Sequence, residues 1–162
     1  MLSQKIVNRG VTPRTTLIFV EATINTKGVW SKMGTAFIKV AAVYLLIGLT
    51  LGIYMGIVER FEFTPVHAHI NLVGWATMGI FGLIYSAFPR AGNSVLGKTH
   101  FWLYNIGALL LLGGMVLFSI GEEGTAFPIA VTGALTVVAA TLVFIVNLFR
   151  NVKAHEAFRR NE

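Results

Sequence analysis

Long stretches without Lys, Arg, Asp or Glu constrain the fold of this 162-residue chain more than any other feature. A run of about 20 apolar residues is long enough to cross the hydrocarbon core of a bilayer as a helix. Only 12% of the residues are charged, well below the share that is usual in soluble domains. The sequence therefore predicts an all-α integral membrane protein. The runs are Val40–Val58, Phe63–Phe88, Phe101–Gly121 and Thr125–Phe149.

The connections between these runs are short, and they predict how the helices are arranged. Short connections make sequential helices antiparallel neighbours, so we expect a four-helix up-down bundle over residues 36–150. Residues 1–35 are expected to form a cytoplasmic or interfacial segment, and residues 151–162 a basic cytoplasmic tail. The expected helices span about 36–58, 63–88, 99–121 and 125–149.

The basic residues predict the orientation in the membrane. All of the 13 Lys and Arg residues except Arg60 fall before the first run, between the second and third, or after the fourth. Short segments rich in Lys and Arg stay in the cytoplasm. We therefore expect a multi-pass protein of a bacterial-type cytoplasmic (inner) membrane with both termini inside. The net charge of +6 then reflects topology and anionic lipid headgroups, and nucleic-acid binding is not expected.

A histidine pair, His67-Ala68-His69, stands near the head of the second run. Ionisable side chains at membrane depth are energetically costly and usually serve a functional site, and imidazole commonly binds metals and haem iron. We expect Thr64 to cap the helix and Pro65 to take its first position. His67 would then lie in the first turn near the outer face, where the helix dipole and low dielectric favour the neutral ring.

Helical geometry separates the two histidines by about 200°, so one ion cannot be bound by both from the same face. The face of His67 continues through small and polar residues, whereas the face of His69 is aliphatic, so we expect His67 to face the bundle interior. Gly74 would leave room for a flat macrocycle below the ligand. For His69, a hydrogen-bonded packing role is equally expected. The candidate metal ligands are His67 and His69, and the candidate cofactor site is completed by Asn71, Gly74 and Met78.

The other histidines are expected to lie on the cytoplasmic side, His100 at the membrane interface and His155 solvated in the tail. About 30 Å of bilayer would separate them from His67. Haem with two histidine ligands in one chain would therefore need His69 in an irregular segment, or a histidine from a second subunit. The chain has no cysteine, which excludes thiolate ligands and haem attached through cysteine.

Glycines at four-residue spacing, Gly48, Gly52 and Gly56, form one stripe of the first expected helix. Small residues let helix backbones approach closely in lipid. Packing within the chain is the favoured interpretation of this stripe, and a subunit interface is the alternative.

The region after the histidine pair resembles a known family, haem–copper oxidase subunit I, which includes cytochrome c oxidases and related nitric oxide reductases. The similarity runs from about Met33 to Gly121. It implies that His67 is an axial ligand of haem near the outer face. Alignment on His-x-Asn would instead assign that role to His69. The residues that carry the resemblance to the second helix and its following loop are Thr64, His67-Ala68, Asn71, Tyr85, Phe88-Pro89-Arg90 and Asn93, and Phe101-Trp102 resembles the start of the third helix.

The sequence also departs from this family. It offers no histidine triad for copper and none of the later haem ligands, so a complete oxygen- or nitric-oxide-reducing centre in one copy is not expected, while a part in an oxidoreductase stays open. The family fold has approximate threefold symmetry, so a homo-oligomer of this chain could resemble it; fold alone does not establish function.

The favoured hypothesis is a small haem-b-binding membrane protein for electron transfer or for binding O2 or NO. Its partners would be lipid, haem, and either further copies of the chain or other respiratory membrane subunits. One alternative is a non-haem copper or zinc site of His67 and His69 with Glu59 or Glu62, which needs a non-helical backbone around Pro65. Another is an accessory membrane subunit without a cofactor.

Overall fold

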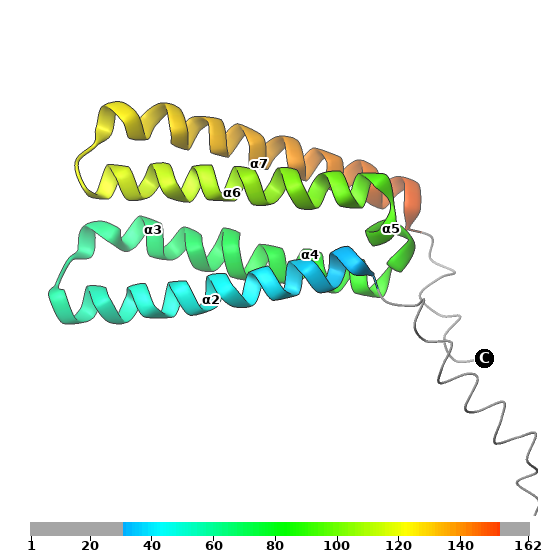
Figure 1. Cartoon of the computed structure of the whole chain (residues 1–162), viewed down its shortest axis with the longest axis horizontal. Coiled ribbons are helices and arrows are strands. Elements are labelled where there is room, and N and C mark those ends of the chain that lie inside the picture. Colours follow the sequence, from blue (N-terminus) through cyan, green and yellow to red (C-terminus); the bar gives the residue numbers. More distant parts are fainter. Residues whose placement is uncertain (1–30, 153–162) are drawn as a thin grey trace, which may run out of the picture. The chain divides into compact units, whose positions relative to one another are not determined.

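A computed structural model describes residues 31–152, and these residues form helices joined by short turns (Figure 1). Four helical segments are long and apolar enough to cross a membrane. This confirms the all-α class and the predicted membrane helices. The expected tail beyond residue 152, with His155, and the segment before residue 31 lie outside the described residues. The four segments are Lys32–Val58, Phe61–Ala87, Val95–Ser119 and Glu123–Asn151.

Serine caps explain why two of these helices begin before the apolar runs do. Ser31 precedes α2 (Lys32–Val58), and its Oγ accepts a hydrogen bond of 3.0 Å from the Gly34 N–H. Ser94 precedes α6 (Val95–Ser119), and its Oγ accepts one of 2.9 Å from the Gly97 N–H. A serine at this position satisfies a backbone donor that the helix itself leaves unpaired. In these two helices, the capping serine rather than hydropathy therefore sets the first residue.

The second membrane segment is a continuous rod of four helical forms. It comprises η2 (Phe61–Phe63), α3 (Thr64–His69), the π-helical η3 (Ile70–Thr77) and α4 (Met78–Ala87). The predicted cap at Thr64 is wrong, because its hydroxyl donates to the Phe61 carbonyl at 2.6 Å and the 3₁₀ turn already begins the rod. Pro65 does lie in the first turn of α3, where its missing N–H costs no hydrogen bond.

Helix α6 packs closely on α7 (Glu123–Asn151), with their backbones in contact at glycines. A Cβ built on Gly133 would lie 2.2 Å from the Leu111 backbone nitrogen, closer than any real contact. The paired positions run in opposite orders along the chain, so the two helices are antiparallel. Shape complementarity at small residues replaces the hydrophobic effect as the source of helix association in lipid. The pairs are Gly107 with Val137, Gly114 with Ala130, and Gly133 with Leu111.

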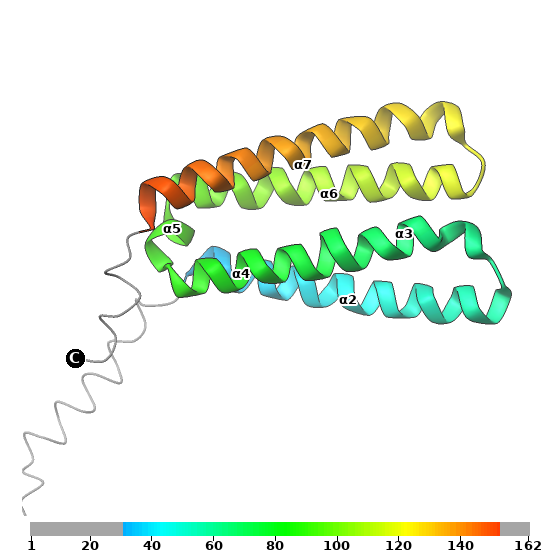
Figure 2. The same cartoon turned by 180° about the vertical axis from the view of Figure 1, so that it is seen from behind.

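Helix α2 packs in the same way on the second rod, and α5 (Pro89–Asn93) then leads to α6 (Figure 2). Gly48 and Gly52 make contacts within the chain, as the favoured interpretation of the glycine stripe expected. A Cβ on Gly56, by contrast, would meet nothing within 4 Å in the described part of the chain. The contacts again run in opposite orders and show an antiparallel pair. They are Gly34 with Ser86, Ile38 with Gly82, Tyr44 with Gly74, Gly48 with Asn71, and Gly52 with His67.

We expect Gly133→Ala to destabilise the α6–α7 pair by about 1–3 kcal/mol, since the added methyl group would press on backbone that cannot move aside alone. Gly113→Ala is the matched control, because a Cβ there meets none of the described residues within 4 Å. The thermal midpoint of the detergent-solubilised protein should fall for the first variant and stay near the wild-type value for the second. Equal midpoints would contradict this packing.

Candidate cofactor site

His67 is held by helix α2 through a hydrogen bond to the backbone. Its Nδ1 lies 3.0 Å from the Gly48 carbonyl oxygen. A carbonyl can only accept, so Nδ1 carries the hydrogen, and the neutral ring then keeps a lone pair on Nε2. This arrangement leaves Nε2 in the form that binds a metal.

Glycine allows α2 to come this close to the imidazole. A Cβ on Gly52 would lie 2.9 Å from the His67 Cε1 atom, so any larger residue would displace the ring or the helix. Asn71 supports the same contact from the other side: its Nδ2 donates to the His67 carbonyl at 2.8 Å, and its amide packs on Gly48. Two glycines and one amide therefore fix the half-buried His67 near the C-terminal end of α2.

The expected room at Gly74 is filled in the structure. A Cβ on Gly74 would lie 2.5 Å from Cγ of Tyr44, so the tyrosine ring of α2 occupies the space proposed for a macrocycle. Met78 is fully buried in the core one turn further on. Asn71 contacts His67, but Gly74 and Met78 serve helix packing below it.

His69 is not brought together with His67. Its Nδ1 lies 2.9 Å from the Pro65 carbonyl oxygen, four residues back on the same helix. The backbone is helical from Thr64 through His69, so the non-helical segment that a shared copper or zinc site requires is not formed. Among residues 31–152, no group of three or more His, Cys, Asp or Glu side chains could hold a metal ion.

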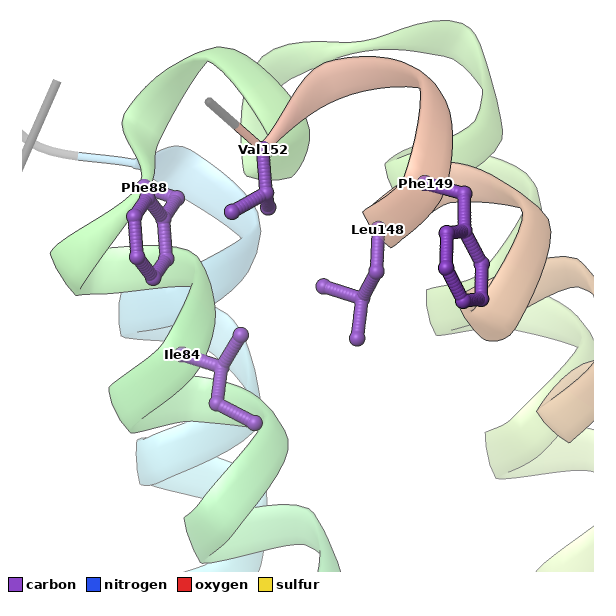
Figure 3. A pocket seen from close by; sticks show the side chains of 5 residues that line it. All are labelled: Ile84, Phe88, Leu148, Phe149 and Val152. Atoms are coloured by element: carbon purple, nitrogen blue, oxygen red, sulfur yellow. The ribbon is translucent and has the colours of Figure 1, made fainter. Parts of the chain in front are cut away.

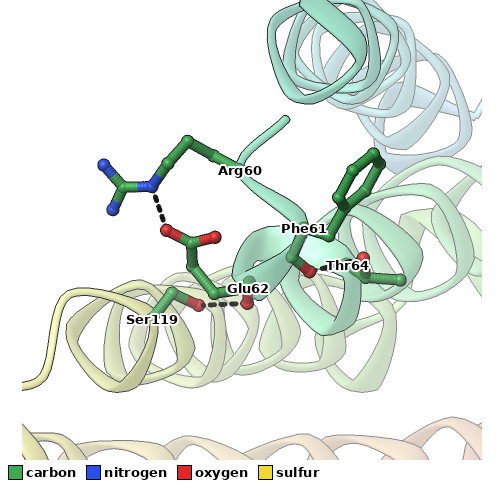
Figure 4. A network of polar contacts seen from close by, with 5 residues as sticks. All are labelled: Arg60, Phe61, Glu62, Thr64 and Ser119. Carbon is green, nitrogen blue, oxygen red and sulfur yellow. Dashed lines mark hydrogen bonds and ion pairs between the residues drawn. The ribbon is translucent and has the colours of Figure 1, made fainter. Parts of the chain in front are cut away.

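Glu62, one of the acidic residues near the histidines, has other partners (Figure 4). Glu62 forms an ion pair with Arg60, and its backbone carbonyl accepts a hydrogen bond of 3.1 Å from Ser119 Oγ. The second contact joins the start of the second rod to the end of α6. The pKa of Arg60 is raised by the hydrogen bond and charge of Glu62. Glu62 is therefore engaged in an ion pair and in tying helices together.

His100 is fully buried between helices, a burial that its expected place at the membrane interface did not predict. Because Ser94 caps α6, the helix begins at Val95, before the residue expected from hydropathy. His100 therefore lies within the helix, on a face where buried residues recur every four positions. The Tyr85 hydroxyl lies 2.9 Å from His100 Nδ1, and Asn147 Nδ2 donates to that hydroxyl at 3.1 Å. The spacing of His100, Tyr104, Ala108 and Leu112 is the sequence signal that could have identified this face.

Aromatic rings enclose the His100 imidazole on several sides. The centroids of Phe37, Phe81 and Phe144 lie 5.1, 4.6 and 5.1 Å from its own. Its Nε2 is buried and has no hydrogen-bond partner among the described residues. The Tyr85–His100–Asn147 cluster thus joins α4, α6 and α7 and acts in packing.

A groove of about 480 Å³ lies between the ends of α4 and α7 (Figure 3). Its walls are aliphatic or aromatic and hold no metal ligand. The groove is therefore an apolar surface of the kind that lipid covers, and it forms no part of the candidate cofactor site. The lining residues are Ile84, Phe88, Leu148, Phe149 and Val152.

Comparison with known families gives one match that includes His67. Residues 56–121 match the family described as Cytochrome C and Quinol oxidase polypeptide I. This segment resembles haem–copper oxidase subunit I. The match confirms the resemblance found in the sequence, and it includes both His67 and the buried His100. A search of curated proteins found no match, and neither did a search of solved structures.

We expect Tyr85→Phe to lower the free energy of unfolding by about 1 kcal/mol, because His100 Nδ1 and the Asn147 amide both lose a buried partner. Tyr54→Phe is the matched control, since Tyr54 is 43% exposed. Unfolding in a graded series of denaturing detergent measures both. Equal stability of the two variants would show that the buried hydroxyl has no net effect.

Proposed function

We propose that this chain is a small haem-b-binding membrane protein in which Nε2 of His67 supplies an axial ligand. The observation that carries the proposal is the hydrogen bond from His67 Nδ1–H to the Gly48 carbonyl. Histidines that bind metals usually donate their other ring N–H in this way, which fixes the tautomer and the ring orientation. The resemblance to subunit I over residues 56–121 makes haem the favoured group.

Bound haem would supply electron transfer, or binding of O2 or NO at an open iron position. The protein residues would bind and orient it. The hydrogen bond to the Gly48 carbonyl would raise the basicity of His67 Nε2 as a ligand. Gly52 lets α2 pack against the ring, and the Asn71 side chain holds the His67 backbone carbonyl.

A further chain is needed in this proposal to cover the cofactor. Tyr44 closes the space over Gly74, and His67 is only half-buried. Beyond Gly52, the stripe continues to Gly56, where an added Cβ would meet no atom of residues 31–152 within 4 Å. The outer end of the α2–α3 pair is thus open to a partner, and we infer a homo-oligomer or assembly with other respiratory membrane subunits.

The proposed setting is a bacterial-type cytoplasmic membrane, crossed up and down with both termini inside. Support comes from the charges: Arg90, Lys98 and Arg150 lie at the end of the described helices where α4 meets α5, whereas Arg60 is paired with Glu62 at the other end. The positive-inside rule assigns the first end to the cytoplasm. His67 then lies near the outer face. The copper or zinc alternative has less support because α3 is helical at Pro65.

The proposed ligand can be tested by spectroscopy on protein purified from haem-supplied cells, with elemental analysis alongside. We expect a Soret band that shifts on reduction in the wild type and is lost in His67→Gly. Imidazole added to the variant should restore the band, because it replaces the deleted ring. His155→Gly, a change in the C-terminal tail, is the control and should keep the wild-type spectrum.

A colourless and metal-free wild type would sink the haem proposal and favour the accessory-subunit alternative. A colourless protein with stoichiometric copper or zinc would favour the metal-binding alternative. An unchanged spectrum in His67→Gly would show that the ligand is another residue.

The proposed orientation can be tested with single cysteines, since the natural chain contains none. Gly124→Cys places a thiol at the start of α7, and Lys98→Cys places one near the start of α6. In intact spheroplasts, a membrane-impermeant maleimide should label the first and not the second. Lysis should expose the second. The reverse labelling pattern would contradict the proposed topology.

A further inference from the structure

We propose that the apolar groove between the ends of α4 and α7 binds one phospholipid with a negatively charged headgroup. An acyl chain of this lipid would fill the groove, and basic residues at the same end of the helices would bind the headgroup. This inference does not depend on haem, so it can fail or succeed separately from the proposed function.

Two matching walls form the groove (Figure 3). Ile84 and Phe88 belong to the α4 wall, and Leu148 and Val152 belong to the α7 wall. In each wall the second residue donates its backbone N–H to the carbonyl of the first, at 2.9 Å, so the two side chains lie one turn apart on the same face. The walls therefore enclose a slot that runs along the helices, which is the direction of an acyl chain in a bilayer.

This slot leaves part of the protein core uncovered. Ile84, Phe88, Leu148 and Val152 pack against the buried core but are themselves only partly buried. Phe149, which also lines the groove, is 87% exposed. The volume of about 480 Å³ lies within the usual range for pockets that hold small ligands, about 300–1,000 Å³. An acyl chain here would complete the packing that the side chains leave open.

The charges at this end of the helices favour an anionic headgroup. Arg90 follows the groove residue Phe88 by two positions, and Arg150 directly follows Phe149 in the last turn of α7. Long basic side chains near the ends of membrane helices extend to the level of the headgroups. Within residues 31–152, the carboxylates belong to the loops and helix ends at the opposite side of the membrane segments: Glu59, Glu62, Glu122 and Glu123.

Basic side chains are required, because the helix ends alone would repel an anion. Both α4 and α7 end at the groove, and the unpaired carbonyls of a helix C-terminus carry a partial negative charge. Positive charge beside a gap between membrane helices is typical of sites for anionic lipids. A zwitterionic lipid with the same chains would gain the apolar contacts but less from these charges. Selectivity for the headgroup therefore distinguishes a site from ordinary contact with the bilayer.

Native mass spectrometry of the delipidated, full-length protein tests this selectivity. The probe is an equal mixture of phosphatidylglycerol and phosphatidylcholine with identical acyl chains. We expect the wild type to retain phosphatidylglycerol several-fold more often, and Arg150→Gln to lose much of this preference. Lys39→Gln is the matched control, because it removes the same charge from α2, a helix that does not line the groove. Equal retention of the two lipids by the wild type would overturn the proposal, as would an unchanged preference in Arg150→Gln.

A second pair of variants tests the place of the acyl chain. Val152→Trp should lose most of the bound phosphatidylglycerol, because the indole would occupy the slot. Leu135→Trp adds the same ring to α7 at a position that is 65% exposed and outside the groove, and it should keep the wild-type level. Full retention in Val152→Trp, or displacement of the lipid by soluble glycerol phosphate, would overturn the proposal. Circular dichroism checks that each variant is folded, and the Arg150→Gln comparison decides alone if Val152→Trp is not.

Discussion

The hydrogen bond from His67 Nδ1–H to the Gly48 carbonyl is the contact on which the account of this protein depends. It requires α2 and α3 to be almost in contact, which Gly48 and Gly52 permit. It selects the tautomer of the neutral ring that carries its hydrogen on Nδ1, with Nε2 as the free atom. The packing of α2 on α3 and the orientation of the His67 ring therefore depend on the same residues. A larger residue at Gly52 would alter both.

The opposite end of the helices uses polar groups differently. Tyr85, His100 and Asn147 are all fully buried, and the Tyr85 hydroxyl is hydrogen-bonded to both of the other side chains. In a membrane, such groups need partners within the protein because lipid offers none. This cluster joins α4, α6 and α7, whereas the α6–α7 contact itself depends on small residues. One end of the helices thus holds a packing cluster and the other holds the candidate ligand.

Much of the fold was readable from hydropathy, because long uncharged runs have few alternatives to membrane helices. What hydropathy could not supply was local: the caps at Ser31 and Ser94, the 3₁₀ turn before Thr64, and the π-helical segment after His69. The missed burial of His100 follows from one of these caps. For His67, helical periodicity correctly separated it from His69, but the Gly48 carbonyl and the Tyr44 ring over Gly74 are tertiary contacts that no sequence spacing reveals.

The protonation of His67 tests the central claim most directly, because it can be measured without haem. The measurement is solid-state NMR of ¹⁵N-histidine-labelled, haem-free protein in lipid vesicles at neutral pH, with the His67 signals assigned by their loss in His67→Ala. The account predicts a protonated Nδ1 and an unprotonated Nε2. A protonated Nε2, whether with a bare Nδ1 or in the imidazolium form, would contradict it.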